Sequence, residues 1–173
     1  MATLKFRGSD PIGFDNVNLT GNDVSALFKV GSRVYDIYDN CYMYVKNAHT
    51  AALAAGNAVT VNLASANNTE SAIEVIGPTT ATLNLFAGIA MGAITAAYYG
   101  WIQVEGWNKE TIATAGAVVA GSSLKCANGV FTMATDQVIG TESTYQATAI
   151  STAALAGAGN LTAGQVYIKS ILA

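Results

Sequence analysis

Residues 33–46 have the sequence RVYDIYDNCYMYVK, and this stretch decides the fold. Side chains alternate in character on both sides of Asp39-Asn40, a dipeptide that is typical of tight turns. An alternation with a period of two places one set of side chains on each face of an extended strand. The sequence therefore predicts a β-hairpin with strands at 33–38 and 41–46 and a two-residue turn at Asp39-Asn40.

Short segments of the same kind continue along the chain, with turn residues between them. They cover residues 58–63, 73–76, 81–86, 89–91, 99–105, 111–119, 123–126, 130–133 and 164–172. Residues 50–55 (TAALAA) before Gly56 predict one helical turn, and the Ala- and Gly-rich residues 147–161 predict a short helix or a loop. Many short strands with little helix predict an all-β fold, as a compact barrel or sandwich.

Residues 1–27 differ from the rest of the chain. They are polar, rich in Asp, Asn and Gly, and show no sustained periodicity. We expect an extended, irregular N-terminal arm at 1–27, followed by one β-rich domain at 28–173. Such an arm either extends into solvent or becomes ordered on a partner. Phe6, Ile12 and Phe14 are spaced as if to enter grooves, so we predict that they anchor the arm to its partner.

The composition favours a protein that works in an assembly. Of the 173 residues, 51% are hydrophobic and only 11% are charged, against about 25% charged in an average soluble domain. A surface with so few charges suits a protein that neighbours cover. The net charge is −3 and the eight Lys and Arg residues are scattered. We therefore expect no nucleic-acid partner, since nucleic-acid binders cluster their basic residues.

The uncharged run at 75–104 raises the possibility of a membrane span, and it contains the GxxxG spacing that favours helix association. Pro78 and Asn84 interrupt the run, and the charges on either side of it, Glu74 and Glu105, are acidic. Real spans are flanked by Lys and Arg. We interpret the run as buried strands and expect no membrane partner. The N-terminus has no basic region followed by an apolar one, so no secretory signal is expected.

The sequence contains few groups that could perform catalysis. His49 is the single histidine, and no GxSxG, P-loop or GxGxxG motif is present. Glu105 and Glu110 flank Gly106-Trp107, and we interpret them as solvated turn carboxylates rather than a catalytic pair. We predict a protein that is not an enzyme, with no catalytic residues.

No cofactor-binding or metal-binding residues are predicted either. Asp36 and Asp39 with Asn40 could contact a cation, but a polar hairpin end is the preferred interpretation. Cys41 and Cys126 lie far apart in the sequence and are expected to be small buried hydrophobes, with a disulfide between them left open.

Three groups of short motifs suggest a family. They are FKVGSRV at 28–34 with 42–46 and 53–59, then GIAM at 88–91 with YGWIQVEG at 99–106, then AGSSL at 120–124 with 128–130 and 163–168. The segment YGWIQVEG looks like the family's "YGWVQ-G" signature. With these motifs, residues 28–173 resemble the small decoration (cement) proteins of tailed-phage heads.

The resemblance implies a β-barrel or β-tulip-like fold, self-association with a trimer favoured, and attachment to the major capsid protein. The attachment would lie at the seams between capsomers, on the outer capsid surface of the virion, where it would stabilise the head. The alternative is a phage head fibre or a carbohydrate-binding surface module, and an exposed aromatic platform would favour sugar binding. Tyr99, Trp101 and Trp107 are expected at a subunit interface, because such aromatic residues are enriched there. Core packing is the alternative for Trp101.

Overall fold

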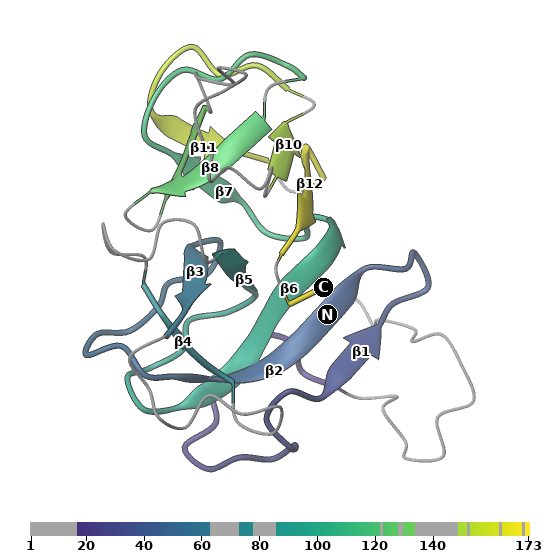
Figure 1. The fold of residues 1–173 in the computed structure, drawn as a ribbon, viewed down its shortest axis with the longest axis vertical. Helices are drawn as coiled ribbons and strands as arrows, with labels where there is room; N and C mark the ends of the chain where they lie inside the picture. Colours follow the sequence, from purple (N-terminus) through teal and green to yellow (C-terminus); the bar gives the residue numbers. More distant parts are fainter. Residues whose placement is uncertain are drawn as a thin grey trace, which may run out of the picture.

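The structure is a computed structural model that describes residues 17–62, 73–77, 86–121, 123–127, 130–133, 149–151, 153–162, 164–170 and 172–173. For residues 123, 125–127, 130–133 and 149–151 it describes the backbone alone. Within these ranges the chain forms twelve strands and no helix, which confirms the all-β prediction (Figure 1). The predicted anchors Phe6, Ile12 and Phe14 lie outside the described residues.

No helix in the described ranges is long and apolar enough to cross a membrane.

A closed barrel occupies the lower half of Figure 1 and is built from the first half of the chain. The strands of this half are β1 (Arg33–Tyr35), β2 (Cys41–Asn47), β3 (Ala58–Val61), β4 (Glu74–Ile76), β5 (Phe86–Ala90) and β6 (Tyr99–Trp107). The barrel order is β2-β4-β3-β5-β6, and a second pairing of β2 with β6 closes it. The β2–β4 pairing is parallel, and the other barrel pairings are antiparallel.

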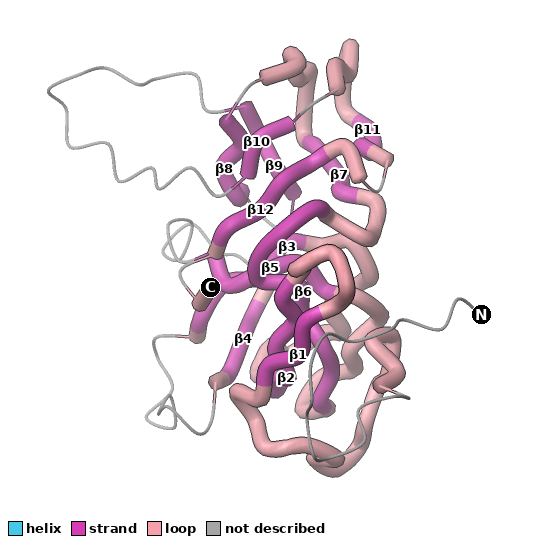
Figure 2. Tube along the Cα trace, turned by 90° about the vertical axis from the view of Figure 1, so that its right-hand side faces the viewer, coloured by secondary structure: helices cyan, strands magenta, loops and turns pink. Residues whose placement is uncertain are grey.

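The second half of the chain extends the sheet away from the barrel. Its strands are β7 (Ile112–Thr114), β8 (Ser123–Ala127), β9 (Val130–Met133), β10 (Ala149–Ser151), β11 (Gly159–Leu161) and β12 (Val166–Lys169). From β6 the sheet continues in the order β12-β10-β8-β9-β7-β11. The strands β7 to β11 group at one end of the molecule in both views (Figure 1, Figure 2).

Strands β2 and β6 are long enough to serve both the barrel and its extensions. β1 pairs with Cys41–Met43 of β2, and β12 pairs with Glu105–Trp107 of β6. Cys41 lies opposite Glu105 across the β2–β6 pair. The two added strands therefore flank the same end of the barrel, and this end carries the candidate site.

The alternation predicted for β2 divides its side chains between two hydrophobic clusters. Cys41, Met43 and Val45 pack in the barrel interior. Tyr42 and Tyr44 point to the opposite face and pack in a second, largely aromatic cluster. Both faces of β2 are therefore covered, which explains why almost every residue of the strand is buried. Cys41 is a buried free cysteine.

A third hydrophobic cluster joins the barrel to the extension. It combines Phe86 and Ile89 of β5 with Ile112, Leu161 and Ile168 from the second half of the chain. All five side chains are fully buried or nearly so. Because burying a large aliphatic or aromatic side chain stabilises a fold by about 1.5–3 kcal/mol, this cluster ties the two halves into one body.

The described end of the predicted arm, residues 17–27, is irregular and packs on the barrel. Leu19 is buried in the aromatic cluster. Asp23 exchanges two backbone hydrogen bonds of 2.9 Å with Tyr99, and its carboxylate accepts a hydrogen bond of 2.6 Å from the Tyr44 hydroxyl. The arm is thus joined to β2 and β6 well before residue 28.

Three local predictions are wrong. The predicted short helix or loop at 147–161 instead contains β10 and β11, which pair with other strands of the sheet. The predicted helical turn at 50–55 is instead a bridge, in which Leu53 and Ile94 exchange backbone hydrogen bonds of 2.9 Å. The physical reason is burial, since Leu53 fills part of the barrel interior. The predicted strand at 33–38 ends at Tyr35, and the turn is a five-residue loop, because the side chain of Asp36 is buried beneath it.

Candidate functional site

Large aromatic side chains lie exposed at the end of the barrel that β1 and β12 flank. Tyr35, Tyr38, Trp107 and Tyr167 are 43%, 69%, 44% and 37% exposed. Trp107 and Tyr167 meet edge to face, with ring centroids 5.5 Å apart. Lys109, two residues after Trp107, places its ammonium 4.8 Å from the centre of the Tyr38 ring. We call these four aromatic residues the aromatic surface.

Buried side chains hold the backbone of Trp107 on both sides. The Trp107 N–H donates a hydrogen bond of 2.7 Å to the side-chain oxygen of Asn40. The Trp107 carbonyl accepts one of 2.6 Å from the side-chain amide of Gln103, whose oxygen accepts one of 3.0 Å from the Lys109 N–H. Asn40 and Gln103 are completely buried. The backbone that carries the exposed indole is therefore held in a fixed position by hydrogen bonds.

Asp36 anchors the loop that carries Tyr38 and Asn40. Its carboxylate accepts hydrogen bonds from the backbone N–H groups of Tyr38 (2.8 Å) and Asn40 (3.0 Å), from the Asn40 side chain (2.7 Å) and from the Tyr42 hydroxyl (3.2 Å). The Lys109 ammonium lies 3.8 Å away. Burial by itself raises the pKa of Asp36, but the bonds from Asn40 and Tyr38 and the Lys109 charge outweigh burial and hold it below its usual value.

Gly106 is required by the same arrangement. Its φ is +103°, a backbone conformation that residues other than glycine rarely adopt. A β-carbon at Gly106 would also collide with the side-chain oxygen of Asn40 and come within 2.9 Å of the Asn40 α-carbon. The absence of a side chain at Gly106 lets β6 pass close to the loop and present Trp107.

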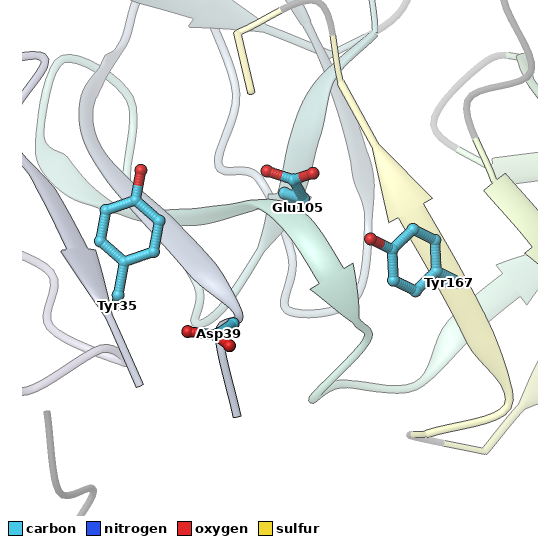
Figure 3. Close-up of a pocket in the computed structure, with 4 residues that line it drawn as sticks. All are labelled: Tyr35, Asp39, Glu105 and Tyr167. Carbon is cyan, nitrogen blue, oxygen red and sulfur yellow. The ribbon is translucent and has the colours of Figure 1, made fainter. Parts of the chain in front are cut away.

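An open pocket with a volume of about 460 Å³ lies between two tyrosines of the aromatic surface. Its lining includes Tyr35 of β1, Asp39 of the following loop, Glu105 of β6 and Tyr167 of β12. Figure 3 shows the two tyrosines on opposite sides and the two carboxylates between them. Glu105 also pairs with Lys169 at 3.9 Å. The pocket therefore combines aromatic walls with carboxylate oxygens.

Of the three residues predicted at a subunit interface, the structure places two in the aromatic cluster and the third apart from them. Trp101 is 1% exposed and packs against Tyr44 and Phe28 in the aromatic cluster, as the core-packing alternative expects. Tyr99 is half-buried and stacks on Tyr44 in the same cluster. Only Trp107 stands exposed, on a different part of β6. An interface role for Tyr99 and Trp107 stays a prediction.

The pocket residues were not predicted from the sequence as a site. The alternation of residues 166–169 does place Tyr167 on the exposed face of β12, but only the strand order brings it beside Tyr35. Asp36 and Asp39 with Asn40 were considered as a possible cation site, and Asp36 is the buried acidic residue of this segment. Its buried carboxylate instead holds the loop together, and the described residues contain no group of three His, Cys, Asp or Glu side chains that could bind a metal ion.

No protein-family model, curated protein or solved structure matches this chain.

Proposed function

We propose that this chain is a virion structural protein that binds the outer surface of a phage capsid, at seams between major capsid proteins, and stabilises the head. The short motifs at 28–34, 99–106 and 120–124 suggest this class. The observation that carries the proposal is the exposed Trp107 side chain. Two buried side chains hold the backbone of this residue in place by hydrogen bonds.

An exposed tryptophan on a rigid support is typical of a protein-contact surface. Tryptophan, tyrosine and arginine dominate binding energy at protein interfaces, and a side chain held in place before binding loses little entropy on association. The aromatic surface presents three tyrosines with Trp107. We assign the surface to contact with a neighbouring protein of the shell. Truncating its central aromatic should remove about 2 kcal/mol or more of binding energy.

The low charge of the chain supports the same assignment. Only 11% of its residues are charged, and the cores of protein interfaces are depleted of charge. Exposed apolar residues also occur in the arm, where Val24 and Leu27 are 71% and 67% exposed. A clamp that bridges capsid subunits needs more than one contact region, so the arm and the aromatic surface act as two. Self-association, with a trimer favoured, is part of the proposal.

Binding to undecorated, expanded heads of the cognate major capsid protein tests the proposal. We expect saturable, ordered density on the outer surface by electron cryomicroscopy, together with a higher melting temperature of the heads. A well-folded protein that leaves the heads bare and their melting temperature unchanged would refute it.

A carbohydrate-binding surface module is the second candidate function. The edge-to-face pair of Trp107 and Tyr167 favours it, because exposed aromatic rings can stack on the apolar faces of sugars. Titration with a panel of neutral oligosaccharides, followed by tryptophan fluorescence, tests this alternative. A saturable change that Trp107→Ala abolishes would favour sugar binding, and no change at millimolar concentrations would remove it.

A further inference from the structure

We propose that one copy of this chain lies across a two-fold axis between identical copies of the capsid protein, with one half of the chain on each side of the seam. This inference rests on the proposed function and names the position on the shell. It starts from a repeat within the chain, which relates the two halves by a local two-fold axis.

The strands β7 to β12 repeat the pairing plan of the barrel strands β2 to β6. β2 pairs in parallel with β4, and β7 pairs in parallel with β9. The antiparallel pairs β3–β4, β3–β5 and β2–β6 recur in the same chain order as β8–β9, β8–β10 and β7–β11. The pair β5–β6 recurs as β10–β12, so β11 and β12 together correspond to the long strand β6. Every pairing of the barrel thus occurs twice.

The two halves also match in their turns and in their sequence. A bridge joins two turns in each half: Leu53–Ile94 in the first and Val118–Leu155 in the second. Three residues after the first member of each bridge, Gly56 and Gly121 adopt left-handed φ angles of +77° and +82°. Aligned on these bridges, ALAAGNAVTV at 52–61 matches AVVAGSSLKC at 117–126, and IAMGAI at 89–94 matches ISTAAL at 150–155. We infer that the second half is a diverged copy of the barrel.

The strand register identifies which residues of β6 and β12 are equivalent. Ile89 and Ile150, which are equivalent in the alignment, lie on β5 and β10. Ile89 lies opposite Gln103 of β6, and Ile150 lies opposite Tyr167 of β12. Gln103 and Tyr167 therefore occupy equivalent positions in the two halves.

Two positions further along β6 and β12 are the equivalent residues Glu105 and Lys169, and they lie opposite each other. The ladder continues beyond this pair, where the Ser170 N–H donates a hydrogen bond of 2.9 Å to the Val104 carbonyl. In a two-fold contact, each half uses the same surface. Equivalent antiparallel strands that meet at an equivalent pair of residues have this relationship. The local two-fold axis therefore passes between Glu105 and Lys169.

The local axis leaves the molecule through the aromatic surface. Glu105 lines the pocket between Tyr35 and Tyr167, and the side chains of Glu105 and Lys169 are 33% and 69% exposed. Trp107 meets Tyr167 beside this pair. In Figure 1, β6 and β12 run between the barrel and the group of β7 to β11. The surface that we assign to the shell thus lies at the middle of the molecule, with one half on each side.

An axis at the contact surface favours a partner with the same symmetry. Two copies of one capsid protein that are related by a two-fold axis present the same groups in opposite directions. A chain whose halves are related in the same way places equivalent strands on both copies. Tyr35 and Tyr38 come from β1 and its loop, which precede the repeat, so the chain has two distinguishable orientations on the axis.

Electron cryomicroscopy of decorated heads, with symmetry relaxed around the two-fold axes, tests this position. We expect one chain for each pair of capsid subunits, with β6 and β12 over the axis and the two halves on different capsomers. Density at three-fold positions, as a trimer would occupy, or both halves on one capsomer would overturn the inference and leave the attachment standing. Heads that stay bare would refute the proposed function and this position with it.

A charge exchange at the axis provides a second readout. Because a two-fold partner offers Glu105 and Lys169 the same surroundings, the double variant Glu105→Lys, Lys169→Glu should bind heads within about twofold of wild type. Lys169→Glu alone leaves like charges opposite each other and should weaken binding at least about fivefold. A double variant that binds as weakly as the single one would overturn the two-fold position. Equal binding of all three proteins would place the pair away from the contact and overturn it as well.

Discussion

The side-chain oxygen of Asn40 accepts a hydrogen bond of 2.7 Å from the backbone N–H of Trp107, which lies 67 residues further along the chain. The same asparagine donates through its side-chain nitrogen to the buried carboxylate of Asp36 at 2.7 Å. One buried amide thus connects the loop between β1 and β2 to the exposed end of β6. The position of the Trp107 indole depends on this connection.

Two buried asparagines in this region should respond oppositely to substitution. Both polar atoms of the Asn40 side chain are hydrogen-bonded, whereas the side-chain amide of Asn108, 1% exposed, has no hydrogen-bond partner in the part of the chain that the structure describes. Asn40→Leu removes one hydrogen-bond partner from the Asp36 carboxylate and one from the Trp107 N–H. The substitution should therefore lower the free energy of unfolding by about 2 kcal/mol or more. Asn108→Leu replaces an unpaired polar group by an apolar one of similar size and should be neutral or stabilising.

Urea denaturation of both variants makes this comparison. Equal losses of stability in Asn40→Leu and Asn108→Leu would show that the hydrogen bonds of Asn40 do not distinguish the two sites.

Gly106→Ala should destabilise the fold and displace Trp107. The left-handed φ of +103° is strained for alanine, and the new β-carbon meets the Asn40 side chain. We expect a loss of about 2 kcal/mol or more in the free energy of unfolding. Gly116→Ala is the matched control, since a β-carbon there has no neighbour within 4 Å among the residues that the structure describes. Thermal unfolding that affects both variants alike would contradict the close approach of β6 to the loop.

Asp36 should make the stability of the protein depend on pH in the acid range. Its pKa lies below the usual value in the folded state, so the ionised carboxylate stabilises the fold above the unfolded pKa. This contribution is lost as the pH falls through the folded pKa, which places the loss below about pH 4. The pKa of Tyr42 is raised by burial and by Asp36, so the hydroxyl stays protonated there.

Comparing wild type with Asp36→Asn isolates this effect, because the contribution of Glu110, whose pKa burial raises, cancels in the difference. Measured by urea unfolding, the stability difference between the two proteins should be constant from pH 7 to about pH 5 and should shrink below about pH 4. A difference that stays constant down to pH 2.5 would mean that the ionisation of Asp36 does not stabilise the fold.

Removing residues 1–16 should weaken attachment without unfolding the barrel. The deletion takes away Phe6, Ile12 and Phe14 but keeps Leu19 and Asp23, which pack on β2 and β6. We expect an unchanged melting temperature and lower occupancy on heads at equal concentration. Removing residues 1–23 should lower the melting temperature as well, because it deletes both contacts. Full occupancy after the shorter deletion would show that the arm does not anchor the protein.

The alternation at residues 41–46 and 99–105 was sufficient to predict β2 and β6, because both strands have two chemically distinct faces. Which strands close the barrel was not predictable, since the pairing of β2 with β6 joins segments about 60 residues apart. The loop at 36–40 was mistaken for a two-residue turn, because the buried position of Asp36 depends on partners from β2 and from Lys109. Trp107 was predicted at a subunit interface, and that role stays a prediction. Tyr35 and Tyr167 line one pocket only because the strand order brings them together.

The most direct test compares Trp107→Ala with Val119→Ala on undecorated heads. Val119 is also exposed, at 60%, but it lies beyond β7 and outside the aromatic surface. We predict that both variants keep the wild-type melting temperature, and that Trp107→Ala binds the heads at least about thirtyfold more weakly while Val119→Ala binds like wild type. Equal binding of all three proteins would contradict the claim that the aromatic surface is where this chain meets the shell.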